Sequence, residues 1–479
     1  MVASLCKFGE RSFSLSDQEL FSRLSGDYNP AHLNELIARR SIFGGVVVHG
    51  IHLFLHVLES WCAIDQRCLW LESIKLEFQH HLHLDRDVSC AAEKLDETRV
   101  KFEVRHGSVV VLAAVCTYAE LPKKGSSKSL PSPCPKKVCS VLSIDEIATA
   151  SGSLSLYFDR TLSGKMFPHI TSLLPSEQIA LMLATTRLVG MDCPGLHSVF
   201  AGLTLSFSAD TFDMESLDYR VAKVVSGLSL VKIDFSALGT EGHIRAFLRP
   251  PAKNQQSYLE LASNIVPGEF SGQNALVIGG SRGLGEVTAK LLSAGGADIK
   301  FTYYRGVEEA TRIREEIVAG GGRADCFDLN VLEKSAGVVE KLEGDWLPTH
   351  LYYYATPFIF DATTKEYSED IFQRFYKFYV KGFTATVESL FGLGMDRLNV
   401  LYPSSVAVDD TPQNMKEYAA AKLAGEKRCI SLQQEMKGIR ISALRFPRLA
   451  TDQTASILKV KNEDPVPVIL KELRELHQL

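Results

Sequence analysis

The 479-residue sequence predicts a multidomain chain of mixed α+β and α/β class: two units with a helix on an antiparallel sheet, then a doubly wound parallel sheet. At roughly 150 residues per domain, the length suggests about three domains. Two stretches before Arg249 share one order of elements, a long apolar helix and then several strands. After Gln273, short apolar strands alternate with longer helical stretches, which is typical of a parallel sheet. We therefore expect domains at residues 1–121, 138–250 and 270–479.

The composition is that of a globular protein, with 46% hydrophobic and 23% charged residues, which excludes a largely disordered chain. A net charge of −5 gives no general attraction to nucleic acid or to anionic membranes, so neither is expected as a partner. Ten cysteines without a CxxC pair predict reduced thiols. The first residues lack the apolar core of a signal peptide, and together these features predict a cytoplasmic location.

The two units before Arg249 look like diverged copies of one another. The first contains a predicted helix over about Val46–Ala63 and the second over about Ser176–Leu188. A strand follows each helix, ending at Phe78 in the first copy and at Phe207 in the second. Pairing of the copies edge to edge would remove exposed strand edges.

Short polar segments mark the limits of the copies. A Ser-Gly pair, expected to form a tight turn, opens the first copy at Ser25 and the second at Ser163. Between the copies, Leu121–Lys137 is rich in Lys, Ser and Pro and is predicted to be a linker.

A carboxylate and an imidazole follow the first Ser-Gly pair. Asn29 precedes a proline and biases the backbone toward a turn, so Asp27 and His32 are expected to converge on one water molecule for acid–base catalysis. A polar capping turn is the alternative interpretation of this short motif. Further along, His49-Gly50 stands near the start of the long helix, where free amides would stabilise an enolate formed from a thioester.

This stretch resembles the MaoC-like, hydratase-2 branch of the hot-dog fold. The residues that match its signature are Ser25, Gly26, Asp27, Asn29, Pro30, His32, Phe43, Gly44, His49 and Gly50. The resemblance implies that Asp27 and His32 activate or release water, with Asn29 positioning them. It also implies that the Gly50 amide contacts the thioester carbonyl. A double hot-dog arrangement would extend the resemblance to about Arg249.

The second copy lacks this pattern. Lys165 and Ile170 stand where Asp27 and His32 stand in the first copy, so one active site per chain is expected. The second copy would then serve as a partner and help to form the acyl-chain tunnel. Three histidines at helical spacing, His49, His52 and His56, are interpreted as helix surface, and no metal site is predicted.

A glycine-rich turn between a strand and a helix predicts a nucleotide site. The strand Asn274–Ile278 leads into GGSRGLG, and the following helix offers its N-terminus to a pyrophosphate. The turn resembles the G-x-x-x-G-x-G of the short-chain dehydrogenase/reductase family, over about residues 274–454. The cofactor-binding residues that we expect are Gly279, Ser281, Arg282, Gly283, Leu284, Gly285, Arg305, Asp328, Ala355 and Lys422.

Two of these residues indicate NADPH as the cofactor. Arg305 follows the second strand, where an acidic residue would hold a ribose diol, and Arg282 is a second cation in the turn. A cation at either place suits a 2′-phosphate, whereas two solvated arginines are the alternative. The resemblance implies that Asp328 contacts the adenine.

Ser405, Tyr418 and Lys422 have the spacing of the family's catalytic residues. Tyr418 and Lys422 lie four residues apart and would share one helix face. Lys422 is expected to lower the pKa of Tyr418, while Ser405 holds the substrate carbonyl or hydroxyl. Tyr379 stands where the family has an Asn that supports a proton relay, so that relay is expected to be altered.

The expected function is that of a bifunctional enzyme on acyl thioesters of coenzyme A or acyl carrier protein, acting as a homodimer. The reductase half would interconvert 3-oxoacyl and 3-hydroxyacyl groups with NADPH, and the hot-dog half would interconvert 3-hydroxyacyl and 2-enoyl groups. A biosynthetic pathway, for a fatty acid or polyketide-like product, is favoured. The alternatives are a catabolic, NAD-dependent hydratase/dehydrogenase, a dehydratase with a silent reductase domain, and a binding or scaffold protein.

Overall fold

The computed structural model describes residues 6–67, 69–120, 129–208, 215–237, 239–333, 337–342, 346–360, 366–458 and 460–478. The chain divides into two compact units, Met1–Pro251 with Ser456–Lys459, and Ala252–Ala455 with Val460–Leu479. The start of the expected linker, residues 121–128, lies outside the described residues. Within the described ranges, every helix is too short or too polar to cross a bilayer.

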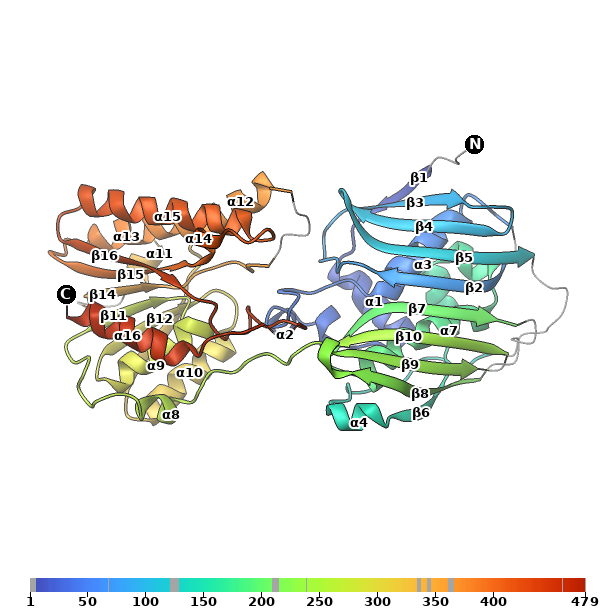
Figure 1. Cartoon of the computed structure of the whole chain (residues 1–479), viewed down its shortest axis with the longest axis horizontal. Coiled ribbons are helices and arrows are strands. Elements are labelled where there is room, and N and C mark those ends of the chain that lie inside the picture. The colour runs from blue at the N-terminus through green and yellow to red at the C-terminus, as the bar shows by residue number, and fades with distance from the viewer. Residues whose placement is uncertain are drawn as a thin grey trace. The chain divides into compact units, whose positions relative to one another are not determined.

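The first unit is built on one ten-stranded antiparallel sheet in the order β1-β3-β4-β5-β2-β7-β10-β9-β8-β6 (Figure 1). Its strands are β1 (Cys6–Arg11), β2 (Leu69–Phe78), β3 (Val88–Lys94), β4 (Arg99–His106), β5 (Val109–Glu120), β6 (Ser151–Ser155), β7 (Ser198–Phe207), β8 (Ser216–Val225), β9 (Leu230–Ala237) and β10 (Thr240–Leu248). Read from opposite edges, the two halves have the same strand order. They meet at β2 and β7, where Ile74 faces Leu205, so edge-to-edge pairing is confirmed.

The helices of this unit are α1 (Leu15–Ser25), η1 (Pro30–His32), α2 (Glu35–Ala38), α3 (Gly50–Cys62), α4 (Ile144–Ala148), α5 (Arg160–Met166), α6 (Pro168–Leu173), α7 (Ser176–Arg187), the π-helical turn η2 (Leu188–Asp192) and η4 (Ser226–Leu228). Of these, α1, α3 and α7 lie on one face of the sheet (Figure 1). The two long predicted helices correspond to α3 and α7. Their apolar faces and the inner face of the sheet form one core.

One local prediction for the second copy is wrong. Gly26 ends α1 with a left-handed φ of 78°, as a turn requires. Ser163 and Gly164 instead lie inside α5, because Asp159 caps that helix and the chain stays helical through the pair.

The second unit contains six parallel strands in the order β13-β12-β11-β14-β15-β16. They are β11 (Asn274–Ile278), β12 (Asp298–Tyr303), β13 (Arg323–Asp328), β14 (His350–Tyr353), β15 (Leu398–Ser405) and β16 (Ile439–Phe446). The helices are α8 (Tyr258–Ala262), α9 (Gly283–Ala294), α10 (Val307–Ala319), α11 (Gly337–Glu340), α12 (Glu369–Tyr376), the π-helical η5 (Lys377–Gly382), α13 (Phe383–Phe391), α14 (Ala407–Asp410), α15 (Lys416–Glu435) and α16 (Pro465–His477).

Both faces of this sheet are covered. Val277 packs in the core that includes α9, α10 and α16, whereas its neighbours Leu276 and Ile278 pack in the core that includes α13 and α15. Alternating side chains of one strand thus enter opposite layers, and Figure 1 shows helices on both sides of this sheet. The strand order is that of a doubly wound nucleotide-binding sheet, so the predicted fold class is confirmed.

Candidate active sites

The first site begins where α1 ends. The Asn29 side chain caps η1 by accepting a hydrogen bond from the Ala31 amide at 3.1 Å, which turns the chain so that His32 follows closely on Asp27. The polar atoms of Asp27, His32 and His49 lie within 4.8 Å of one another. The structure therefore brings the predicted carboxylate and imidazole together and adds His49, from the N-cap of α3, to them.

Hydrogen bonds assign the reactive nitrogen of His32. Its Nδ1 lies 2.8 Å from the carbonyl oxygen of Val47, so Nδ1 carries the proton and Nε2 carries the lone pair. The ring stacks on that of His49, with centroids 3.7 Å apart and planes at 25°. Neutral His32 is thus arranged as a base.

Gln18, on the buried face of α1, holds His49 in place. Its Oε1 accepts hydrogen bonds from the backbone amide of His49 at 3.1 Å and from Nδ1 at 2.9 Å. The Nε2 atom of His49 then faces the Asp27 carbonyl oxygen at 3.2 Å and its carboxylate at 3.9 Å. Sequence reasoning missed Gln18, because a single glutamine that precedes the motif and is not part of it gives no signal.

The interpretation of the helix histidines as surface residues is wrong. His49 and His52 are fully buried and His56 nearly so. His52 stacks on Phe21 with ring centroids 4.6 Å apart, and its Nδ1 lies 3.3 Å from Gln18 Nε2. Burial lowers the pKa of both His52 and His56, which keeps these rings neutral inside the core.

Burial also sets the protonation of the acid–base pair. Burial raises the pKa of Asp27. The nearby His32 and the hydrogen bonds from Thr186 and Asn29 lower this pKa, but their effect is smaller than that of burial. Burial lowers the pKa of His32, more than Asp27 raises it. Both shifts favour a carboxylic acid beside a neutral imidazole, which is the pairing that acid–base catalysis requires.

Gly50 is the first residue of α3, beside His49, as predicted. An added Cβ there would lie 2.5 Å from the Phe78 ring, so the packing requires a glycine. The half-buried residue therefore offers a helix-terminal amide next to the acid–base pair.

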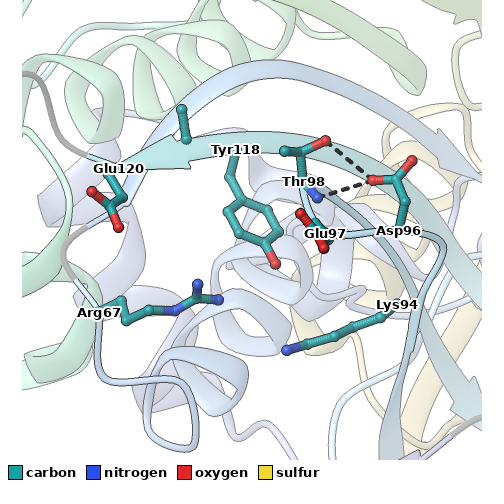
Figure 2. Close-up of a pocket in the computed structure, with 8 residues that line it drawn as sticks. Arg67, Lys94, Asp96, Glu97, Thr98, Tyr118 and Glu120 are labelled. Carbon is teal, nitrogen blue, oxygen red and sulfur yellow. Dashed lines mark hydrogen bonds between the residues drawn. The ribbon is translucent and has the colours of Figure 1, made fainter.

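A cavity of about 640 Å³ lies elsewhere in this unit (Figure 2). Figure 2 shows Tyr118 between Arg67 and Lys94, with Asp96 hydrogen-bonded to Thr98. Tyr118 pairs with Leu71 near one end of β2, whereas Gly50 touches Phe78 at the other end. Seven strand residues span about 23 Å, so this cavity is separate from the acid–base pair.

In the second unit, the predicted glycine turn forms a narrow cradle. Gly279 and Gly283 have left-handed φ values of 80° and 59°. A Cβ on Gly285 would lie 2.2 Å from the Gly279 carbonyl oxygen. Ser281 and Leu284 are half-buried in the turn, and the Ala355 backbone lies against Gly279. The turn precedes the free amides of α9, so these residues fit a bound pyrophosphate.

The two predicted cations differ in their surroundings. Arg282 Nη1 forms an ion pair with Asp452 Oδ2 at 3.0 Å, and Asp452 is buried. The Arg305 guanidinium lies 5.2 Å from the Tyr304 ring centroid. Asp452 is a further residue that sequence reasoning missed, because it lies far along the chain, after β16.

Asp328 ends β13, as predicted. Its carboxylate accepts a hydrogen bond from Lys341 at 2.8 Å, and this contact lowers the pKa of Asp328. Both residues line a cavity of about 120 Å³ beside α11 and α13.

Ser405, Tyr418 and Lys422 come together at the end of β15 and the start of α15. Burial raises the pKa of Tyr418 to about 12, although a hydrogen bond with Ser405 lowers it. The expected lowering by Lys422 is therefore wrong for this structure. Lys422 donates a hydrogen bond to the Pro403 carbonyl oxygen at 2.6 Å and lies 5.8 Å from the Tyr418 ring centroid, and burial lowers its own pKa to about 7.

Tyr379 explains where the lysine points. Its buried ring lies 3.8 Å from Lys422 Nζ, an attractive cation–π contact. Its hydroxyl lies 2.6 Å from Thr356 Oγ1. The ring thus occupies the space beside the lysine, at the position where the family has its relay Asn.

Comparisons with known proteins find a family for part of each unit. Residues 7–115 match the MaoC like domain, and residues 273–462 match short chain dehydrogenase. Versicolorin reductase 1 from Dothistroma septosporum is 24% identical over 195 residues, covering 40% of this chain and 74% of that protein.

Two solved structures are similar to part of the chain. A short chain dehydrogenase from Burkholderia cenocepacia J2315 in complex with NADP is 21% identical, with a TM-score of 0.39, covering 43% of this chain and 91% of that one. A blue fluorescent protein from a metagenomic library in complex with NADPH is 24% identical, with a TM-score of 0.36, covering 39% and 78%. On the two family matches, the chain is an enzyme that joins a MaoC-like dehydratase domain to a short-chain dehydrogenase/reductase domain.

Proposed function

We propose that the enzyme reduces 3-oxoacyl thioesters with NADPH and then dehydrates the 3-hydroxyacyl product to a 2-enoyl thioester. The observation that carries the proposal is the cluster of Asp27, His32 and His49 beside the Gly50 amide. The carrier is coenzyme A or acyl carrier protein, and the pathway is biosynthetic. The product of one domain is the substrate of the other.

The dehydration step follows from the protonation states. His32 Nε2 removes the proton from the carbon next to the thioester carbonyl, and the Gly50 amide stabilises the negative charge on the carbonyl oxygen. Asp27, whose protonated form is favoured by its burial, gives its proton to the leaving hydroxyl, which departs as water. His32 and Asp27 then exchange the proton and return to their starting states.

The reductase step uses the second unit. The turn Gly279–Gly285 would hold the cofactor pyrophosphate, and Arg305 with Arg282 would hold a 2′-phosphate, while Asp328 and Ala355 would flank the adenosine. Bound NADPH supplies a hydride to the carbonyl carbon. Ser405 holds the carbonyl oxygen, and Tyr418 donates the proton, for which the rise in its pKa to about 12 leaves the phenol protonated.

One alternative has support of its own. The Tyr379 ring over Lys422, and the pairing of Arg282 with Asp452, favour a dehydratase whose reductase domain is silent. Three incubations separate these functions, with products identified by mass: a 3-oxoacyl-CoA with NADPH, the same substrate with NADH, and an enoyl-CoA with NADPH. Hydroxyacyl and enoyl products together support the proposal. Turnover with NADH alone would favour the catabolic alternative, and hydration of an enoyl-CoA without NADPH oxidation would favour the silent reductase.

We also propose a cytoplasmic homodimer. The cysteines whose side chains are described are all free thiols, which supports a reducing compartment. Sedimentation of the purified chain tests the dimer, because a monomer at micromolar concentration would contradict it.

A further inference from the structure

The second half of the double hot-dog reaches into the site of the first. Thr186 Oγ1, at the end of α7, donates a hydrogen bond to Asp27 Oδ2 at 2.7 Å, and both residues are buried. We propose that Thr186 is a positioning residue that sets the orientation and the protonation of Asp27. This inference rests on the proposed dehydratase function and assigns part of that site to the copy without an acid–base pair.

A second residue of the same segment fits the carboxylate. A Cβ added to Gly190 would lie 2.4 Å from Asp27 Oδ1 and 2.7 Å from Oδ2, so the bare Cα packs against the carboxylate. The Gly190 carbonyl oxygen also accepts a hydrogen bond from Asn29 Nδ2 at 3.0 Å.

The local helix geometry places both contacts on one face. Thr186 and Gly190 are four residues apart along the helix. The chain widens into the π-helical turn η2 just after Thr186, and Gly190 lies within that turn. Such turns occur often at functional sites. The Asp27 carboxylate thus lies against one helix face, which offers it a hydroxyl donor at Thr186 and a bare glycine backbone at Gly190.

The hydroxyl has a specific electrostatic effect. Burial raises the pKa of Asp27, and the hydrogen bond from Thr186 lowers it by favouring the charged form. Loss of this donor must therefore raise the pKa of Asp27 further. A residue that only filled space would leave the pKa unchanged.

The test compares three variants in the full chain. Thr186→Val removes the hydroxyl at nearly constant volume, and Thr186→Ser keeps it. Thr185→Val makes the same change in the neighbouring buried threonine, whose hydroxyl donates to the Met182 carbonyl oxygen of its own helix. Hydration of crotonyl-CoA is measured as kcat/KM from pH 5 to 9.

With Thr186→Val, the limb of the pH profile that reports Asp27 should move to higher pH by about one to two units. The profiles of Thr186→Ser and Thr185→Val should match that of the unmodified protein. A Thr186→Val profile that overlays the unmodified one, or an equal shift with Thr185→Val, would overturn the inference.

A second measurement needs no catalysis. Unfolding midpoints are compared for the unmodified protein, Thr186→Val, Asp27→Ala and the double variant, since Asp27→Ala removes the acceptor of the Thr186 hydrogen bond. Thr186→Ala takes the place of Thr186→Val if that variant does not fold. The effects should be non-additive, because the two side chains are in contact; additive effects would overturn the inference. If the unmodified protein hydrates no enoyl thioester, the proposed function fails, and this cycle still decides the role of Thr186.

Discussion

Replacement of Asp27 by Asn should separate catalysis from stability in the dehydratase domain. The carboxylate accepts hydrogen bonds from Thr186 Oγ1 at 2.7 Å and from the Asn29 amide at 3.1 Å. An Asn side chain can keep both, because its Oδ1 accepts from the amide while its Nδ2 donates to the threonine oxygen. It has no acidic proton, so hydration and dehydration should fall by about 10²–10⁴-fold.

The expected stability change is small for Asn and large for Ala. With both hydrogen bonds kept, Asp27→Asn should change the free energy of unfolding by no more than about 1 kcal/mol. Asp27→Ala leaves two buried donors unsatisfied at about 1–3 kcal/mol each, so we expect a loss of about 2–6 kcal/mol. Asp27→Asn is therefore the variant for the catalytic test.

Stability also carries a pH signature. Because the folded state raises the pKa of Asp27, it binds this proton more tightly than the unfolded chain. The free energy of unfolding of the unmodified protein therefore falls as the pH rises through the folded-state pKa. Asp27→Asn lacks this loss, so its relative stability should grow with pH.

The assays are hydration of an enoyl-CoA, NADPH oxidation with a 3-oxoacyl-CoA as the control, and denaturant unfolding. NADPH oxidation should stay intact, because the second unit has its own site. Hydration by Asp27→Asn within about threefold of the unmodified rate would refute the reasoning, since removal of a true acid–base group costs far more.

Three further predictions concern the reductase unit. Arg305→Asp should weaken NADPH binding by about tenfold or more with little effect on NADH binding, because a charge-assisted phosphate contact is lost. Fluorescence titration measures both affinities, and equal affinities of the unmodified protein for the two cofactors would contradict the prediction. Tyr418→Phe should abolish ketoreduction while NADPH affinity is kept, since the hydroxyl acts only on the reacting carbonyl; residual turnover above about 1% would argue against this role. Lys422→Met should flatten the pH dependence of stability. The pKa of Lys422 is about 7 in the folded protein against 10.5 in its ordinary state, so the free energy of unfolding of the unmodified protein should rise between these pH values. Urea unfolding at several pH values measures this, and the same slope of free energy against pH in the variant would contradict it.

Local signals in the sequence predicted the fold and part of both sites. The Asn29-Pro30 turn and the apolar helix after it were enough to place Asp27 beside His32. In the same way, strand, glycine turn and helix predicted the cradle at Gly279–Gly285. Such motifs are short, so their geometry depends on neighbours along the chain.

Contacts between distant segments could not be predicted in this way. Thr186 contacts Asp27 across 159 residues, and Asp452 pairs with Arg282 across 170. Neither partner belongs to a motif, and tertiary packing alone brings them together. The orientation of Lys422 toward Tyr379 was missed for a related reason, because spacing along a helix gives the face of a side chain but not what packs against it.

The two copies, which pair edge to edge through β2 and β7, are free to differ because they belong to one chain. In a symmetric dimer of identical units, each substitution occurs on both sides of the interface. Here both sides belong to one chain, so a change in one copy is not repeated in the other. Thr186 and Gly190 can be selected solely for how they serve Asp27, while the second copy carries Lys165 and Ile170 at no cost to the first. Because both copies are parts of one polypeptide, one can carry the acid–base residues while the other carries the residues that position them.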